Sequence, residues 1–98
     1  MYDQFWFDVG HQERHRVEFY CDRMWGQVRI HVDGQLAQKK LLAFSVRLTH
    51  RFRFTVGHQE RHEVLIVRKR PLILSVSRPS TYRIFVDGAP FLTLQGQP

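Results

Sequence analysis

Val-Gly-His-Gln-Glu-Arg-His occupies residues 9–15, and the same seven letters return unchanged at residues 56–62. Two similar segments follow in the same order, Arg-Ile-His-Val-Asp-Gly at 29–34 and Arg-Ile-Phe-Val-Asp-Gly at 83–88. The offset between equivalent residues rises from 47 in the first block to 54 in the second, so the second half carries seven more residues between the blocks. The chain is therefore an internal duplication whose homologous halves divide near residue 49.

Apolar and polar residues alternate along most of both halves. Successive side chains of a strand point to opposite faces, so this period of two is typical of strands with one buried face. No stretch has the period of an amphipathic helix. The apolar positions of the eight predicted strands are Phe5, Phe7 and Val9; Val17, Phe19 and Cys21; Val28, Ile30 and Val32; Leu42, Phe44, Val46 and Leu48; Phe52, Phe54 and Val56; Val64 and Ile66; Tyr82, Ile84 and Val86; and Leu92 and Leu94.

Asp-Gly pairs end an alternating run in each half, at residues 33–34 and 87–88. Asp-Gly supplies the positive φ angles of a tight hairpin turn, and Gly10 and Gly57 likewise begin short polar connections. Each half is therefore predicted to be a four-stranded meander, with the segments Leu36 to Lys40 and Lys69 to Ser80 left open as loops, extra strands or both. One small sheet cannot bury its own apolar face, so we expect an all-β fold in which the two sheets pack as an antiparallel β-sandwich with pseudo-two-fold symmetry.

The composition fits a single small domain spanning residues 1–98, with halves at about 1–49 and 50–98. Hydrophobic residues make up 43% of the chain and charged residues 24%, and the formal net charge is +6. The lone Cys21 excludes an internal disulfide, and the first residues lack a secretion signal, so we expect a cytoplasmic protein. Unbroken apolar runs reach only four residues, whereas a membrane-spanning helix needs about 20. We expect no membrane span and no cofactor.

Five short strand-and-turn motifs follow one another along almost the whole chain. They are Phe7-Asp8-Val9, His15-x-Val17-Glu18-Phe19, Val32-Asp33-Gly34, Phe54-x-Val56-Gly57 and Tyr82-x-Ile84-x-Val86-Asp87-Gly88. In order and spacing they resemble the β-sandwich domain of the Fas apoptotic inhibitory molecule family. The resemblance implies a non-enzymatic, protein-contacting role, in cell-death signalling and in keeping other proteins from aggregating. The perfect Gly-His-Gln-Glu-Arg-His repeat and the basic charge depart from that family and leave the partner open.

The repeated motif also offers candidate metal ligands. His11, His15, His58 and His62 provide two pairs of imidazoles, which are common ligands of zinc and copper. No thiolate is near, and a pair four residues apart faces one way only on a helix, which Gly10 and Gly57 disfavour. We favour a structural interpretation, in which His15 and His62 begin the second strand of each half at the rim of the core. Glu13, Arg14, Glu60 and Arg61 then form solvated loops whose charges pair locally and contribute little.

No catalytic residues are predicted. The serines lie in no Gly-x-Ser-x-Gly context, and no phosphate-binding glycine loop is present. Asp33 and Asp87 form a symmetric pair of carboxylates, but each precedes a glycine in a turn, where aspartate is favoured for local hydrogen bonding. The sequence therefore favours a non-enzymatic protein.

Positive charge is concentrated in the second half. Residues 1–49 hold seven Lys and Arg against six Asp and Glu, net +1, whereas residues 50–98 hold eight against three, net +5. Phe52 and Phe54 are expected to face the core, so they cannot form a stacking platform for nucleic-acid bases. The positive charge could still attract phosphate backbones, so a basic nucleic-acid-binding domain is kept as the alternative function. The candidate anion-binding residues are Arg51, Arg53, Arg68, Lys69, Arg70 and Arg78.

The outward faces of the two sheets are predicted to differ. Where the first half has Glu18, Tyr20 and His31, the second has Leu65, Val67 and Phe85, and we expect Phe91 and Ile73 to join them. An apolar outer face is usually covered by a partner. We expect a symmetric homodimer through the second sheet, with the chain's own connection from Lys69 to Ser80 as the other possible cover. The predicted function is a non-catalytic protein-interaction module.

Overall fold

A computed structural model of the chain describes residues 2–22, 25–42, 48–70 and 80–96. This part of the chain forms strands and turns with no helix, which confirms the predicted all-β fold. The strands are β1 (Tyr2–Val9), β2 (His15–Asp22), β3 (Gln27–Val32), β4 (Gln35–Leu41), β5 (Thr49–Val56), β6 (His62–Lys69), β7 (Thr81–Val86) and β8 (Ala89–Gln95).

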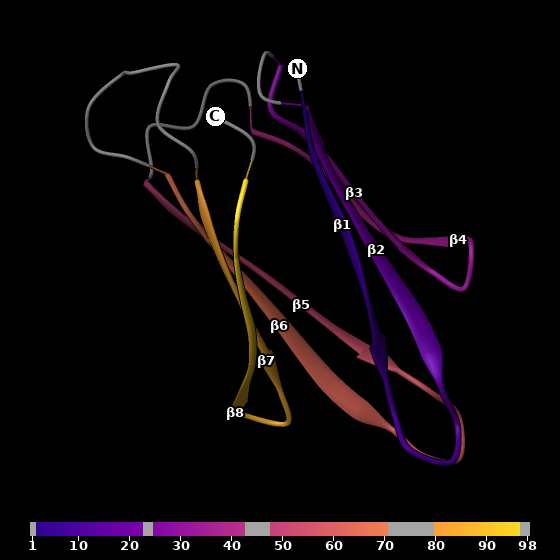
Figure 1. Ribbon diagram of the computed structural model, residues 1–98. Helices are drawn as coiled ribbons and strands as arrows, with labels where there is room; N and C mark the ends of the chain where they lie inside the picture. The colour runs from indigo at the N-terminus through magenta and orange to yellow at the C-terminus, as the bar shows by residue number, and fades with distance from the viewer. Residues whose placement is uncertain (1, 23–24, 43–47, 71–79, 97–98) are drawn as a thin grey trace.

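Each half forms its own four-stranded antiparallel sheet, with neighbours in the order β1-β2-β3-β4 and β5-β6-β7-β8 (Figure 1). Both are meanders, as the turn chemistry predicts. The tight turns have positive φ at both central residues, 51° at Asp33 and 52° at Asp87, each followed by its glycine. Register shifts lie between Ile30 and His31 in one sheet and at the equivalent step in the other. The two halves therefore share even their irregularities.

The prediction was wrong for the fourth strand of the first half. Leu42 to Leu48 was expected to form it, but β4 is Gln35–Leu41. The turn at Asp33 joins two strands directly, so the next strand must start at Gln35. Most of β4 is exposed on both faces, which removes the apolar alternation that marks the other strands. Leu42 packs against the core just after β4, and Leu48 is half-buried just before β5. The predicted apolar positions at 44 and 46 lie outside the described residues.

The two sheets bury their inner faces against each other in layers set by the strand registers. Aromatic rings join the sheets, with the Phe19 ring centroid 5.8 Å from that of Phe52 and 5.1 Å from that of Tyr82. Two middle layers are apolar. They contain Phe5, Phe19, Ile30, Phe52, Ile66 and Ile84 in one, and Phe7, Val17, Val32, Phe54, Val64 and Val86 in the other. Polar and charged side chains lie at both ends of this core, and they are the residues to consider as candidate functional sites.

Candidate functional site

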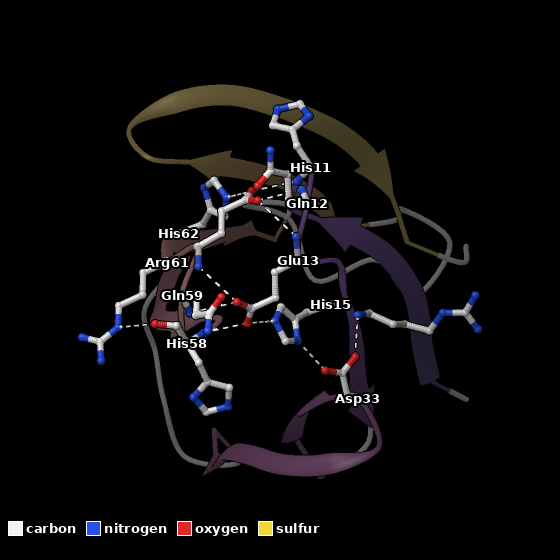
Figure 2. Close-up of polar contacts among 11 residues, drawn as sticks. His11, Gln12, Glu13, His15, Asp33, His58, Gln59, Arg61 and His62 are labelled. Carbon is white, nitrogen blue, oxygen red and sulfur yellow. Dashed lines mark hydrogen bonds and ion pairs between the residues drawn. The ribbon is translucent and has the colours of Figure 1, made fainter.

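The two copies of the repeated motif lie side by side at one end of the sandwich (Figures 1 and 2). Residues 10–14 connect β1 to β2, and residues 57–61 connect β5 to β6. Gly10 and Gly57 have φ angles of 108° and 96°, and a Cβ atom at either would overlap a carbonyl oxygen three residues later in its own loop. These glycines are therefore required by the loop shape, which aims successive backbone N–H groups at one point.

The carboxylate of Glu13 occupies the point where the N–H groups of the opposite loop converge. It accepts hydrogen bonds from the backbone N–H groups of His58, Gln59 and Glu60, at 2.7, 2.8 and 3.1 Å (Figure 2). Successive N–H groups of this kind form an anion-binding concavity. The loop of the second half thus binds a side chain of the first half as its anion.

The same contact is made in the reverse direction. The carboxylate of Glu60 accepts from the backbone N–H groups of His11, Gln12 and Glu13, at 2.7, 2.7 and 3.1 Å. The prediction that these glutamates pair only locally was therefore wrong, because their backbone contacts join the two halves. Their N–H partners lie 45 to 49 residues away along the chain. We call this reciprocal contact of the two loops the glutamate exchange.

Each glutamate also contacts the histidine two residues after it. His15 lies at the start of β2 with its side chain 13% exposed, as the structural interpretation predicts. Its Nε2 is 2.6 Å from Glu13 Oε2, and its Nδ1 is 2.5 Å from Asp33 Oδ2. The other oxygen of Asp33 accepts the backbone N–H of Arg16. Carboxylates can only accept, so a ring that donates from both nitrogens is an imidazolium.

The second half repeats this bridge. His62 lies between Asp87 and Glu60, with nitrogen-to-oxygen distances of 2.7 and 2.5 Å. Hydrogen bonding to the aspartate first, and to the glutamate second, raises the pKa of each bridging histidine above 6.5.

The pKa values of the two glutamates move in the opposite direction. They fall from their usual 4.5 to about 2. For Glu13 the largest cause is the backbone N–H of Glu60, and for Glu60 it is the side chain of His62. The pKa values of Asp33 and Asp87 are lowered by their histidines first.

The four histidines considered as metal ligands are not brought together as a metal site. His15 and His62 have both ring nitrogens on carboxylates, whereas His11 and His58 are exposed. A metal needs a neutral imidazole with a free lone pair. In the parts of the chain that the structure describes, no three or more His, Cys, Asp or Glu side chains are placed to hold a metal ion.

These charge states give the fold a pH dependence that can be predicted. The glutamates stabilise the folded state above pH 4.5, and this contribution is lost as pH falls toward 2. The histidines stabilise it below pH 6.5, and theirs is lost as pH rises through their raised folded pKa. We expect the melting temperature to be highest between about pH 5 and 6.5 and to fall on both sides.

Scanning calorimetry from pH 3 to 9 checks this expectation. His15→Gln with His62→Gln removes the imidazolium bridges and should flatten the alkaline side of the profile. His11→Gln changes an exposed ring and serves as the control. A wild-type melting temperature that stays constant or rises from pH 6 to 9 would contradict the charge assignment.

The predicted interface residues Leu65, Val67 and Phe85 lie together on the outer face of the β5–β8 sheet and are half-buried. Leu65 is paired with Arg53 on one side and Phe85 on the other. Val67 is paired with Arg51 and Arg83 in the same way. We call this surface the basic face. It comprises Arg51, Arg53, Leu65, Val67, Lys69, Arg83 and Phe85.

Two other predicted interface positions do not belong to that surface. The ring of Phe91 is exposed but lies 5.9 Å from that of Phe7, an inward-facing residue of the opposite sheet. It therefore lies where the two sheets meet at their edges. Ile73 lies outside the described residues, as does most of the Lys69 to Ser80 connection.

The candidate anion-binding residues are divided among different environments. Arg51, Arg53 and Lys69 are exposed, and Arg53 forms an ion pair with Glu63 at 3.1 Å. Arg68 is only 8% exposed and points into the core, which contradicts its assignment to a surface patch. Arg70 is half-buried, and Arg78 lies outside the described residues. The exposed cations Arg51, Arg53 and Lys69 therefore belong to the basic face, whereas Arg68 does not.

A buried polar cluster at the other end of the core was missed in the sequence. Tyr82 donates its hydroxyl to Asp3 at 2.6 Å, and Arg68 Nε donates to the Tyr82 oxygen at 3.1 Å. Burial is the first cause that raises the pKa values of Tyr82 and Cys21. The sequence signal was the alternation itself, because Asp3 is in phase with Phe5 and Arg68 with Ile66.

Comparison with known proteins gave no match to a family model, to a curated protein or to a solved structure. Among the described residues, no helix is long and apolar enough to cross a membrane.

Proposed function

We propose that this chain is a non-catalytic protein-interaction module that contacts its partner through the basic face. One observation carries the proposal: Leu65, Val67 and Phe85 replace Glu18, Tyr20 and His31 at equivalent outward positions of an otherwise duplicated sheet. A β-sandwich needs only its inner faces buried in order to fold, so apolar residues on one outer face are not explained by folding. Burial against another protein explains them.

The rest of the site supports a binding role rather than catalysis. The charged groups at the loop end are held by each other, because both nitrogens of His15 and His62 and both oxygens of Asp33 and Asp87 are engaged. A general acid or base must be able to reach a substrate. The resemblance to the Fas apoptotic inhibitory molecule family implies a function of the same non-enzymatic class.

A homodimer through the second sheet stays a prediction within this proposal. Two copies that meet through the same surface would bring Arg51, Arg53 and Arg83 close to the same residues of the other copy. Like charges oppose such a contact, and salt screens them. If a second copy is the partner, dimerisation should therefore increase with ionic strength.

Binding to oligonucleotides separates the proposal from its alternative. We expect no saturable binding of single-stranded or duplex DNA at near-physiological salt, because the cations of the basic face surround apolar side chains that phosphates cannot use. Fluorescence anisotropy measures this directly. Saturable binding that falls steeply with salt and disappears in Arg51→Glu/Arg83→Glu would replace the proposal with the nucleic-acid-binding alternative.

A further inference from the structure

The basic face has an apolar centre with cations on both sides. Along one line across the strands lie Arg53, Leu65 and Phe85, and along the next lie Arg51, Val67 and Arg83. Lys69 follows Val67 on β6 at the next outward position. Arginine stems can cover apolar neighbours while their guanidinium groups stay in water. A partner on this face therefore meets hydrocarbon at its middle and positive charge at both margins.

The outer face of the first sheet does not share the net positive charge of the basic face. Among the described residues of the β5–β8 sheet, Glu63 is the one carboxylate on the same face as the four cations, and it already pairs with Arg53. The equivalent face of the first sheet carries three carboxylates and three cations, and it includes the ion pair of Asp8 with Arg16. Those groups are Asp8, Glu18, Asp22, Arg16, Arg29 and Lys39. The duplicated fold thus provides one neutral face and one basic face on the same scaffold.

The chemistry of the face distinguishes its possible occupants. A second copy presents like charges, and a nucleic-acid backbone presents phosphates with nothing apolar to cover Leu65 and Phe85. A protein segment with carboxylates beside its apolar side chains satisfies both features together. Arginine can donate two parallel hydrogen bonds to one carboxylate, whereas lysine cannot. Three of the four cations on the basic face are arginines.

We propose that the basic face binds an acidic amphipathic protein segment, whose apolar side chains cover Leu65, Val67 and Phe85 and whose carboxylates pair with Arg51, Arg53 and Arg83. This inference rests on the proposed function, because it specifies the partner of the same surface. It adds the sign and placement of the partner's charge.

The probe is a labelled helical peptide with leucines along one side and glutamates flanking them, and its fluorescence anisotropy is measured as the protein is added. We expect saturable binding that weakens with salt. Arg51→Glu/Arg83→Glu should weaken it by at least about tenfold. Leu65→Glu/Phe85→His should do so as well, and these substitutions copy Glu18 and His31 of the first sheet, so folding should survive. Circular dichroism verifies that.

Arg29→Glu is the matched control, because Arg29 is the equivalent of Arg83 on the neutral face. It should leave peptide affinity within about twofold. A second peptide with every glutamate replaced by glutamine tests the charge separately. Equal binding of both peptides at the basic face would overturn the acidic partner while leaving the protein-interaction module intact.

Two other outcomes would overturn the inference. Binding lost in Arg51→Glu/Arg83→Glu but unchanged in Leu65→Glu/Phe85→His would reduce the contact to unspecific attraction between charges and would overturn the inference. No binding of the acidic peptide would overturn it too. If light scattering then showed a dimer that Leu65→Glu/Phe85→His dissociates, the second copy would be the occupant and the proposed function would stand.

Discussion

Glu13→Gln should lower the melting temperature by several degrees at pH 6, although the side chain belongs to a surface loop. The substitution keeps the size of the side chain but replaces one acceptor oxygen with an NH₂ group. The amide keeps only one acceptor oxygen, so it cannot accept from His58 at one position and from Gln59 and Glu60 at the other as the carboxylate does, and the neutral side chain no longer balances the His15 imidazolium. Calorimetry or thermal circular dichroism gives the shift.

The duplication supplies the comparison for this prediction. Glu60→Gln should cause a loss of similar size, because Glu60 makes the equivalent set of contacts in the opposite direction. Glu18→Gln is the same chemical change on the outer face of β2 and should have little effect. If Glu13→Gln and Glu18→Gln shift the melting temperature equally, the glutamate exchange does not hold the two halves together.

Arg68→Met is expected to destabilise the protein on the order of 3 kcal/mol, because it removes a cation from a buried polar cluster. Arg68 donates to Tyr82, which donates to Asp3, and the Asp3 side chain is almost fully buried. The substitution removes the charged donor to Tyr82 from a cluster that also contains the buried Asp3 side chain. Urea denaturation measures the change in the free energy of unfolding.

A double variant tests whether these groups act together. Asp3→Leu/Arg68→Met removes both ends of the cluster, and its free energy of unfolding should fall by less than the sum of the two single variants. Arg51→Met changes an exposed arginine of the neighbouring strand and should alter stability by less than about 0.5 kcal/mol. Strict additivity of the two buried substitutions would show that the cluster is not a coupled unit.

Most of the fold could be predicted because several features of the sequence occur in both halves and agree. Strict alternation, two Asp-Gly turns and the duplicated blocks independently indicate two equivalent meanders. The fourth strand of the first half could not be placed by alternation, since β4 is exposed on both faces. Its register instead follows from the turn at Asp33, which is local backbone geometry rather than hydrophobic patterning.

The candidate site was less predictable, for a physical reason. The identical residues 9–15 and 56–62 show that the halves share an origin, but they do not show that the two loops are in contact. Ion pairs within one loop would be equally compatible with the sequence. The glutamate exchange depends on how the two sheets pack against each other. The run Arg68-Lys69-Arg70 favours an anion-binding surface, but the phase of Arg68 along β6 places it in the core. Phase was the better guide than charge clustering.

The apolar substitutions on the second sheet could be found from the sequence, because equivalent positions of the two halves can be compared directly. The structure adds the arrangement of the surrounding cations, which the linear order of Arg51, Arg53 and Arg83 does not give. A binding surface built from three strands is visible only when their registers are known.

Amide hydrogen exchange of Glu13→Gln, followed residue by residue by NMR, tests most directly whether each half holds the loop of the other. The account predicts faster exchange at His58, Gln59 and Glu60, whose acceptor has changed, and retained protection at His11 and Gln12, which Glu60 still binds. Loss of protection confined to the loop that carries the substitution, or no protected amides in either loop of the wild-type protein, would contradict it.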